Sequence, residues 1–370
     1  MNNKNFLENI IEGSTEFFAY KNKDKKKGPG SKEKGFPFYN PSMELNRDLS
    51  VVFLQWLVDN SKKSLKILDG LASSGIRGIR FANEINGNFE VFVNDWDEKA
   101  FNLIKKNIEK NNLENVEPLN NNLNSILSQE KFDYIDIDPF GSPVYFFDSA
   151  LRSIKNNGVI SCTATDTATL CGVYPKVCRR RYDAIPFHSV CMKEVGIRIL
   201  LGCITRTASR YDKGILPLLS YTTDHYFRCY VRVFDSVSRA NDSISKVGLV
   251  DSDEKIGFEK PNKSVGPLWM DKIHFKKMFR DIRPIVTDKK LGCKNNIWKL
   301  LELLEEEAVA PNFFYTTDSL SSFYKTSSPK KKVLFNLLEK EGYKIYNTHF
   351  EPTGFKTNAS LEYLKKIFKK

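Results

Sequence analysis

Hydrophobic and polar positions along residues 64–165 follow two alternating patterns. Short apolar runs with β-branched and aromatic residues predict strands, and apolar positions spaced three or four apart predict helices at 73–85, 97–112 and 144–154. Strands and helices that alternate at this pace predict an α/β fold with a doubly wound, Rossmann-like parallel sheet. The five predicted strands are SLKILDG (64–70), FEVFVND (89–95), VEPLNNN (116–122), FDYIDID (132–138) and GVISCTAT (158–165).

The rest of the chain predicts flanking elements and a second, smaller domain. A polar stretch at 236–266, rich in Gly, Ser and Asp, predicts a domain boundary, with residues 1–265 as the catalytic domain and 266–370 as a C-terminal α+β domain. The other predicted elements are helices at 45–60, a long helical stretch at 176–211, a strand at 226–234 that closes the sheet edge, helices at 294–309 and 330–342, and a hairpin after them.

Polar residues stand at the carboxyl ends of the predicted strands, where open α/β sheets bind ligands. Asp69 precedes a loop with glycines at 70, 75 and 78, whose spacing differs from the G-x-G-x-x-G dinucleotide fingerprint. Asp95 ends the next strand, 20 residues after Gly75, where a carboxylate can accept hydrogen bonds from a ribose diol. The pattern favours S-adenosylmethionine over NAD. Turn chemistry for the glycines and a helix cap for Asp95 are the alternatives.

The sequence DPFG at 138–141 places a carboxylate, a rigid corner and an aromatic ring where the fourth strand ends. An exocyclic base amine is a poor nucleophile because its lone pair is delocalised into the ring. A carboxylate such as Asp138 can accept the amine hydrogens and free that lone pair, and Phe140 can stack on an extruded base. The pattern predicts methyl transfer to a base amine, with helix capping as the alternative role for Asp138.

Composition and charge limit the partners and the compartment. The formal net charge is +12, which suits a polyanion such as nucleic acid, or an acidic membrane surface. Residues 21–34 form a lysine-rich stretch that is either a solvated linker or a contact to RNA or DNA. Seven cysteines without a CxxC pair predict buried, reduced side chains rather than disulfides or a zinc site. No apolar run reaches the length of a membrane span, so we expect no membrane segment and a cytoplasmic protein.

Several motifs in unchanged order resemble the tRNA guanine-N2 dimethyltransferase family, of the archaeal type that acts on position 26 of tRNA. The resemblance runs from about residue 38 to the C terminus. The matching motifs are FYNPSMELNRDLSV (38–51), SSGIRGIRFA (73–82), VNDWDEKA (93–100), DIDPFGSP (136–143), TATDTATLCG (163–172), DHYFRCYVRV (224–233), GPLW (266–269) and THFEPTGFKTNA (348–359).

The resemblance implies roles for individual residues. Asp138 would be the catalytic carboxylate, Asp95 would bind the cofactor ribose, and Arg47 and Arg77 would hold the methionine carboxylate of S-adenosylmethionine. The family often has an Asp–Ala pair facing the adenine, where this chain has Asn122 and Leu123. An asparagine carbonyl can still accept the adenine hydrogen bond. Some relatives carry a four-cysteine zinc site, but residues 235–292 contain no cysteine, so we expect no metal.

The resemblance also implies the reaction, which is the addition of one and then two methyl groups to guanosine 26 of tRNA by a monomer whose C-terminal domain binds tRNA. The lysines that end the chain, Lys365, Lys366, Lys369 and Lys370, are expected to contribute to that binding. Two alternatives remain open at this point: a base-amine methyltransferase acting on another RNA or on DNA, and a non-catalytic RNA-binding protein on a methyltransferase fold.

Overall fold

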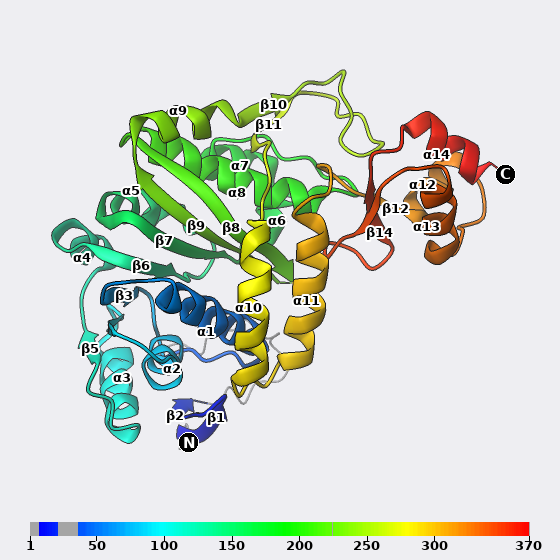
Figure 1. Cartoon of the computed structure of the whole chain (residues 1–370). Coiled ribbons are helices and arrows are strands. Elements are labelled where there is room, and N and C mark those ends of the chain that lie inside the picture. The colour runs from blue at the N-terminus through cyan, green and yellow to red at the C-terminus, as the bar shows by residue number, and fades with distance from the viewer. Residues whose placement is uncertain (1–6, 21–35, 224, 370) are drawn as a thin grey trace, which may run out of the picture. The chain divides into compact units, whose positions relative to one another are not determined.

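The computed structural model describes residues 7–20, 36–223 and 225–369 (Figure 1). The predicted basic stretch at 21–34 and Lys370 lie outside the described residues. The chain divides into two compact units. The first comprises Met1–Asp138, Asp148–Ser161 and Lys277–Lys299, and the second comprises Pro139–Phe147, Cys162–Lys276 and Leu300–Lys370. The domain boundary expected at 265/266 stays a prediction.

A seven-stranded sheet with the order β5-β4-β3-β6-β7-β9-β8 confirms the predicted α/β fold class. β3 pairs in parallel with both β4 and β6, and β4 pairs in parallel with β5. The strand order reverses between β3 and β6, which makes their carboxyl ends the topological switch point of the sheet. The strands are β3 (Leu65–Asp69), β4 (Phe89–Asn94), β5 (Val116–Leu119), β6 (Phe132–Ile137), β7 (Ile154–Ala164), β8 (Lys213–Thr223) and β9 (Tyr226–Asp235).

Amphipathic helices connect the parallel strands of the first unit. α3, for example, buries Leu103, Ile104 and Ile108 at helical spacing, and the Asp97 carboxylate caps its first turn. A hairpin, which the sequence pattern did not predict, precedes these helices. The elements are β1 (Leu7–Glu12), β2 (Thr15–Tyr20), η1 (Pro41–Met43), α1 (Glu44–Asp59), α2 (Ile76–Glu84), α3 (Glu98–Lys110), α4 (Leu123–Gln129), α5 (Val144–Ser153) and α10 (Lys276–Asp288).

The second unit contains most of the helices and strands that follow β7, whereas most of α10 and the start of α11 belong to the first unit. In its C-terminal part, α12, α13 and α14 bury Leu320, Leu334, Leu338 and Leu364 together with Phe355 of β14 (Figure 1). The elements are α6 (Thr167–Leu170), α7 (Pro175–Tyr182), α8 (Met192–Ser209), α9 (Val237–Ser245), β10 (Val247–Val250), β11 (Val265–Trp269), α11 (Lys294–Glu307), β12 (Tyr315–Thr316), α12 (Thr317–Tyr324), α13 (Lys331–Lys340), β13 (Ile345–Asn347), β14 (Gly354–Thr357) and α14 (Leu361–Phe368).

One prediction about a flanking element was wrong. The strand at 226–234 is β9, but it does not close the sheet, because β8 lies outside it. The long helical stretch expected within 176–211 is α8, and the shorter α7 precedes it across a segment that contains Pro186, which cannot donate to a helical ladder. The predicted C-terminal hairpin is the antiparallel pair β13 and β14, to which β12 adds a third strand.

Six of the seven cysteines are buried, as predicted, and Cys293 is half-buried. Burial raises the pKa of the Cys171 thiol to about 11, so this side chain is an inert thiol at neutral pH.

Candidate active site at the carboxyl ends of the strands

Asp69 and the carboxylates of β6 meet at the switch point of the sheet. Asp69 pairs in register with Asp136 across β3 and β6, and both side chains are buried. The Gly70 N–H donates to the Asp136 carbonyl oxygen (3.0 Å), which holds the start of the glycine loop against β6. Asp69 also accepts a hydrogen bond at Oδ2 from the Gly78 N–H at the start of α2 (2.9 Å). Asp69 therefore closes the glycine loop between β3 and α2.

The glycines of this loop are required by close packing. Gly75 has a φ of +78°, in the left-handed region, and a Cβ there would lie 2.8 Å from Ile104. At Gly78 a Cβ would lie 2.5 Å from Val93. The loop thus packs directly against β4 and α3 at the carboxyl ends of the strands.

Asp95 fastens two loops at the end of β4. Its Oδ2 accepts from the Ser73 N–H (2.8 Å) and its Oδ1 accepts from the Asp97 N–H (3.0 Å). These two hydrogen bonds connect the loop after β3 to the loop after β4. Trp96, the next residue, is 72% exposed. The sequence pattern did not select this tryptophan, although its position directly after a candidate ribose ligand is a signal that could have found it.

Asn122 and Leu123 start α4 after β5. The Asn122 Oδ1 accepts from the Asn124 N–H (2.9 Å), so Asn122 is the N-cap of this helix. Leu123 is buried, and a Cβ added to Gly70 would lie 2.8 Å from its side chain. Leu123 therefore packs against the start of the glycine loop.

Arg77 joins the predicted catalytic acid to the body of the first unit. Its Nη1 donates to Asn46 Oδ1 (2.7 Å) and Ser50 Oγ (2.8 Å) of α1, and its Nη2 forms an ion pair with Asp138 Oδ2. Its Nε lies 3.5 Å from Asp136 Oδ1. Arg77 is buried, whereas the Asp138 side chain is 21% exposed. Asp138 therefore offers a partly exposed carboxylate, held by Arg77, at the carboxyl end of β6.

Arg47 has acidic and backbone partners of its own. Its Nε donates to Glu12 Oε2 (2.7 Å) and its Nη2 to the Asn40 carbonyl oxygen (3.1 Å). The Tyr39 hydroxyl donates to Glu12 Oε1 (2.6 Å). Burial alone would raise the pKa of Glu12, but the charges of Arg47 and Arg80 and the hydrogen bonds from Arg47 and Tyr39 together lower it. Arg47 is therefore tied to the N-terminal hairpin.

The corner after Asp138 belongs to the second unit and is held by backbone hydrogen bonds. The Gly141 N–H donates to Thr165 Oγ1 (2.6 Å), and the Thr165 N–H donates to the Gly141 carbonyl oxygen (2.9 Å). Phe140 is 58% exposed. A phenyl ring on a fixed corner is available for stacking.

We expect Asp69 to make stability depend on pH. Burial, and then the charge of Asp136, raises the pKa of Asp69 to about 7. Between pH 4 and pH 7 the folded protein holds a proton that the unfolded chain has lost, so stability falls as pH rises, by up to about 1.4 kcal/mol per pH unit. Asp69→Asn cannot titrate but can still accept from Gly78. Its free energy of unfolding, relative to wild type, should therefore increase from pH 5 to pH 8 in urea titrations.

The matched control is Asp148→Asn, which removes an exposed acid on α5. Its difference from wild type should be nearly constant over the same pH range. A constant difference for Asp69→Asn as well would contradict the raised pKa.

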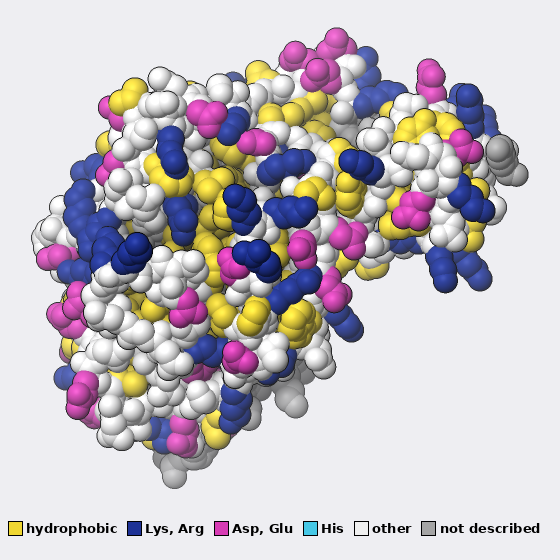
Figure 2. Space-filling view, viewed as in Figure 1, with side chains coloured by type: hydrophobic (Ala, Val, Ile, Leu, Met, Phe, Trp, Pro, Cys, Tyr) yellow, Lys and Arg dark blue, Asp and Glu magenta, His cyan; other side chains and the backbone are white. Residues whose placement is uncertain are grey.

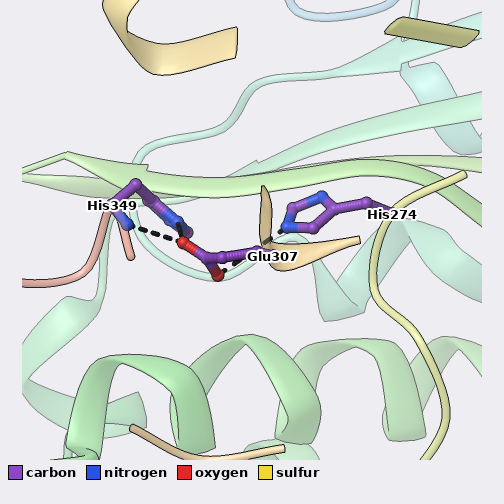
Figure 3. Close-up of side chains that lie close together, drawn as sticks. All are labelled: His274, Glu307 and His349. Atoms are coloured by element: carbon purple, nitrogen blue, oxygen red, sulfur yellow. Dashed lines mark hydrogen bonds and ion pairs between the residues drawn. The ribbon is translucent and has the colours of Figure 1, made fainter. Parts of the chain in front are cut away.

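A second cluster of candidate ligands lies apart from this site, in the second unit. His274, Glu307 and His349 offer three ligand atoms within 4.8 Å of one another (Figure 3). Glu307 Oε1 accepts from His349 Nδ1 (2.7 Å) and from Thr348 Oγ1 (2.9 Å), and Glu307 Oε2 lies 3.7 Å from Lys356 Nζ. Burial would raise the pKa of Glu307, but His349 and Lys356 hold it well below its ordinary value.

The imidazole tautomers of this cluster disfavour a metal. The Thr222 N–H donates to His349 Nε2 (3.2 Å) and the Ser220 N–H donates to His274 Nδ1 (3.4 Å). Each ring therefore directs a protonated nitrogen at Glu307, whereas a metal requires a lone pair. The geometry is that of a buried hydrogen-bonded cluster, and the absence of zinc stays a prediction.

Chelation should leave the protein unchanged. Treatment with EDTA should not alter the midpoint of thermal unfolding, because His349 and Thr348 donate to Oε1 of Glu307 and Lys356 lies 3.7 Å from its Oε2. Elemental analysis of untreated protein checks the same point. Stoichiometric zinc that is lost on chelation together with stability would contradict the tautomer assignment.

The described chain contains no helix that combines the length and the apolar character needed to cross a membrane.

The chain is similar to known proteins over nearly its whole length. A family model described as N2,N2-dimethylguanosine tRNA methyltransferase matches residues 19–369. The chain is 37% identical to a tRNA (guanine(26)-N(2))-dimethyltransferase of Methanobrevibacter smithii, over 90% of this chain and 91% of that protein. It is 39% identical to the Pyrococcus abyssi protein of the same name, over 88% and 90%. The structure of Trm1 from Pyrococcus horikoshii with S-adenosyl-L-methionine matches with a TM-score of 0.85 and 33% identity, covering 98% of this chain and 99% of that one.

Proposed function

The chain belongs to the N2,N2-dimethylguanosine tRNA methyltransferase family, and from this membership we propose which of its residues carry the reaction. The reaction is transfer of one and then two methyl groups from S-adenosylmethionine to the N2 amine of guanosine 26 of tRNA. The observation that carries the proposal is the ion pair between Arg77 and Asp138, which fixes a carboxylate at the switch point of the sheet.

The loops at the ends of β3, β4 and β5 are suited to hold the methyl donor. When bound, S-adenosylmethionine supplies an electrophilic methyl group on a sulfonium. Asp95 is proposed to accept hydrogen bonds from the ribose hydroxyls at the end of β4, and Gly75 lets the loop before α2 pack closely against α3. Asn122 stands at the end of β5 for the adenine amine, and Leu123 and Asp69 support the loop from below.

Asp138 is proposed to accept hydrogen bonds from the guanine amine. The carboxylate draws the amine nitrogen towards sp³ geometry, stabilises the positive charge that develops on it, and receives a proton after methyl transfer. Arg77 is proposed to position Asp138 through a pair of anchors on α1, Asn46 and Ser50. This role is supported by hydrogen bonds, and a contact of Arg77 or Arg47 with the methionine carboxylate stays a prediction.

Phe140 is proposed to stack on the guanine once it has left the tRNA core. The ring is exposed, and its corner is held through Gly141 and Thr165. Stacking on an aromatic ring is worth about 1–3 kcal/mol per base and would hold the flat face of the guanine, while Asp138 addresses its edge.

We place the enzyme in the cytoplasm as a monomer without zinc, with tRNA bound by basic residues. Lys365, Lys366 and Lys369 are exposed on and after α14, and Figure 2 shows Lys and Arg side chains spread over one face of the molecule. Such charges favour tRNA through release of counterions.

The decisive experiment incubates the purified protein with isotope-labelled S-adenosylmethionine and an unmodified tRNA transcript. Mass analysis of nucleosides should find N2-methylguanosine first and N2,N2-dimethylguanosine later. A matched transcript with adenosine at position 26 should remain unlabelled. Label on another base, or transfer only to DNA, would overturn the substrate and leave the fold intact.

Replacing Asp95 by alanine should weaken binding of S-adenosylmethionine by roughly 10-fold or more. The ribose hydroxyls lose a charged acceptor, and each such hydrogen bond is worth about 1.5–3 kcal/mol. Calorimetry measures the effect directly, with Asp95→Asn as the variant that keeps one acceptor and should lose less. Unchanged affinity in a folded Asp95→Ala protein would assign Asp95 to fastening the loops at Ser73 and Asp97 only.

A further inference from the structure

We propose that α7 and the turn before it form a docking surface for the tRNA backbone next to the Phe140 corner. This inference rests on the proposed function and adds where on the second unit the substrate is held. The α7 surface is defined by Val173, Tyr174, Lys176, Arg179, Arg180 and Arg181.

The α7 surface is densely basic. Four of the eight residues of α7 are cations and none is acidic. Arg179 and Arg180 are exposed, and within the described part of the chain neither forms an ion pair. Cations at a helix C-terminus are favoured by the helix dipole, but that effect needs only one, and two further exposed guanidinium groups are free to bind phosphates.

Exposed aromatic rings accompany these charges. Tyr174 is 56% exposed at the start of α7, beside the exposed Val173, and Tyr145 on α5 is 66% exposed. Guanidinium groups bind phosphates while aromatic rings stack on bases or ribose, so this mixture suits RNA. A membrane of anionic lipids or an acidic protein segment would match the charges but not the combination with a corner built to hold a base.

Hydrogen bonds connect the α7 surface to the catalytic corner. Ser142, two residues after Phe140, donates to the Tyr182 hydroxyl at the end of α7 (2.9 Å), and that hydroxyl donates to Asp166 Oδ1 (2.7 Å). Arg181 Nη1 lies 3.1 Å from Asp166 Oδ2. Burial and the Asp166 charge raise the pKa of Tyr182, so its hydroxyl remains a donor.

These hydrogen bonds fix the position of the α7 surface relative to the corner that carries Phe140. The segment at 141–142 is held on one side by Thr165 and on the other by Tyr182, and all these residues belong to one compact unit. A phosphate bound at Arg179 or Arg180 is therefore at a fixed position relative to Phe140, which helps to present one nucleotide of a folded RNA to the site.

The test compares two double variants that each remove two exposed cations. Arg179→Ala/Arg180→Ala should raise the Kd for tRNA by roughly 10-fold and lower the slope of log Kd against log salt by roughly 2. Lys105→Ala/Lys106→Ala on α3 is the matched control and should change neither by more than a small factor. Binding of S-adenosylmethionine and the single-turnover rate at saturating tRNA should be unchanged in both.

Two results would overturn the docking surface. The first is equal tRNA binding by both double variants in a preparation whose wild type methylates tRNA. The second is an absence of protection from hydrogen exchange at 173–182 when wild-type protein is saturated with tRNA, a measurement that needs no variant to fold. Loss of binding to anionic vesicles with tRNA binding intact would assign the surface to lipid instead. Failure of wild type to methylate tRNA would overturn the proposed function itself.

Discussion

Asparagine in place of Asp138 should lower the rate of methyl transfer by on the order of 10² or more while the fold and donor binding are retained. The amide has nearly the volume of the carboxylate and can still accept from Arg77, so the geometry of the sheet edge survives. What is lost is the negative charge that stabilises the positive charge developing on the guanine amine. Single-turnover transfer at saturating tRNA and S-adenosylmethionine isolates this chemical step from binding.

Two companion variants separate the roles at the corner. Asp138→Ala should be at least as damaging as Asp138→Asn, because no acceptor remains for the amine hydrogens. Phe140→Ala should mainly weaken productive binding of the base, by about 1–3 kcal/mol. Its rate of methyl transfer should approach that of wild type at saturating tRNA. A near-normal rate in Asp138→Asn would show that the charge is dispensable, and near-normal rates in both Asp138 variants would leave the residue only a structural role.

The parallel sheet and its acidic strand ends were predictable from local pattern. Strands buried on both faces appear as short apolar runs, and Asp69, Asp95 and Asp138 each follow such a run directly. Because the carboxyl ends of parallel strands share one edge, these acids had to gather there. The prediction needed no knowledge of side-chain contacts.

The partners of Arg77 were not predictable in the same way. Asn46 and Ser50 come from α1, and Asp136 and Asp138 from the end of β6, so only the folded chain brings them to one guanidinium. The resemblance implied a contact with the ligand. The structure adds the ion pair between Arg77 and Asp138, which the spacing of residues along the chain does not predict.

The sequence pattern predicted β9 as the edge strand and missed β8, which contains Pro217. A proline in an otherwise apolar run argues against a strand, because it removes a ladder donor. Here β8 is the edge strand, and its register with β9 shifts between Pro217 and Leu219, so the missing donor falls at an irregularity. Edge position, which decides whether a proline is tolerated, is a property of the whole sheet.

Residues of the motif THFEPTGFKTNA (348–359) form buried ion pairs and hydrogen bonds with two acidic side chains. Lys356 Nζ lies 3.0 Å from Glu194 Oε2 of α8 and 3.7 Å from Glu307 Oε2 of α11, and all three side chains are almost fully buried. Thr348 and His349, at the start of the motif, donate to the other oxygen of Glu307. The motif thus neutralises two acids inside the second unit, and it serves stability rather than contact with tRNA at these positions.

Replacing Lys356 by methionine should therefore lower the free energy of unfolding by about 3–5 kcal/mol, the usual cost of removing one partner from a buried ion pair. The methionine fills much of the same volume, so the loss comes from Glu307, which no longer has a lysine beside it, and from Glu194, which keeps Arg198 but loses Lys356. Urea denaturation measures it, with Lys344→Met as the matched control. Lys344 is exposed in the same region, and its loss should cost less than about 0.5 kcal/mol.

A double variant makes the same argument independent of whether Lys356→Met folds well. Glu307→Gln in the Lys356→Met background removes the negative charge that has lost its lysine and keeps an oxygen that can accept from Thr348 and His349. The double variant should therefore be more stable than Lys356→Met alone, although Glu307→Gln by itself should destabilise wild type. Such opposite signs arise only when the two sites interact directly. Simple addition of the two single effects would mean that Lys356 does not neutralise Glu307 and that the motif stabilises the unit by packing alone.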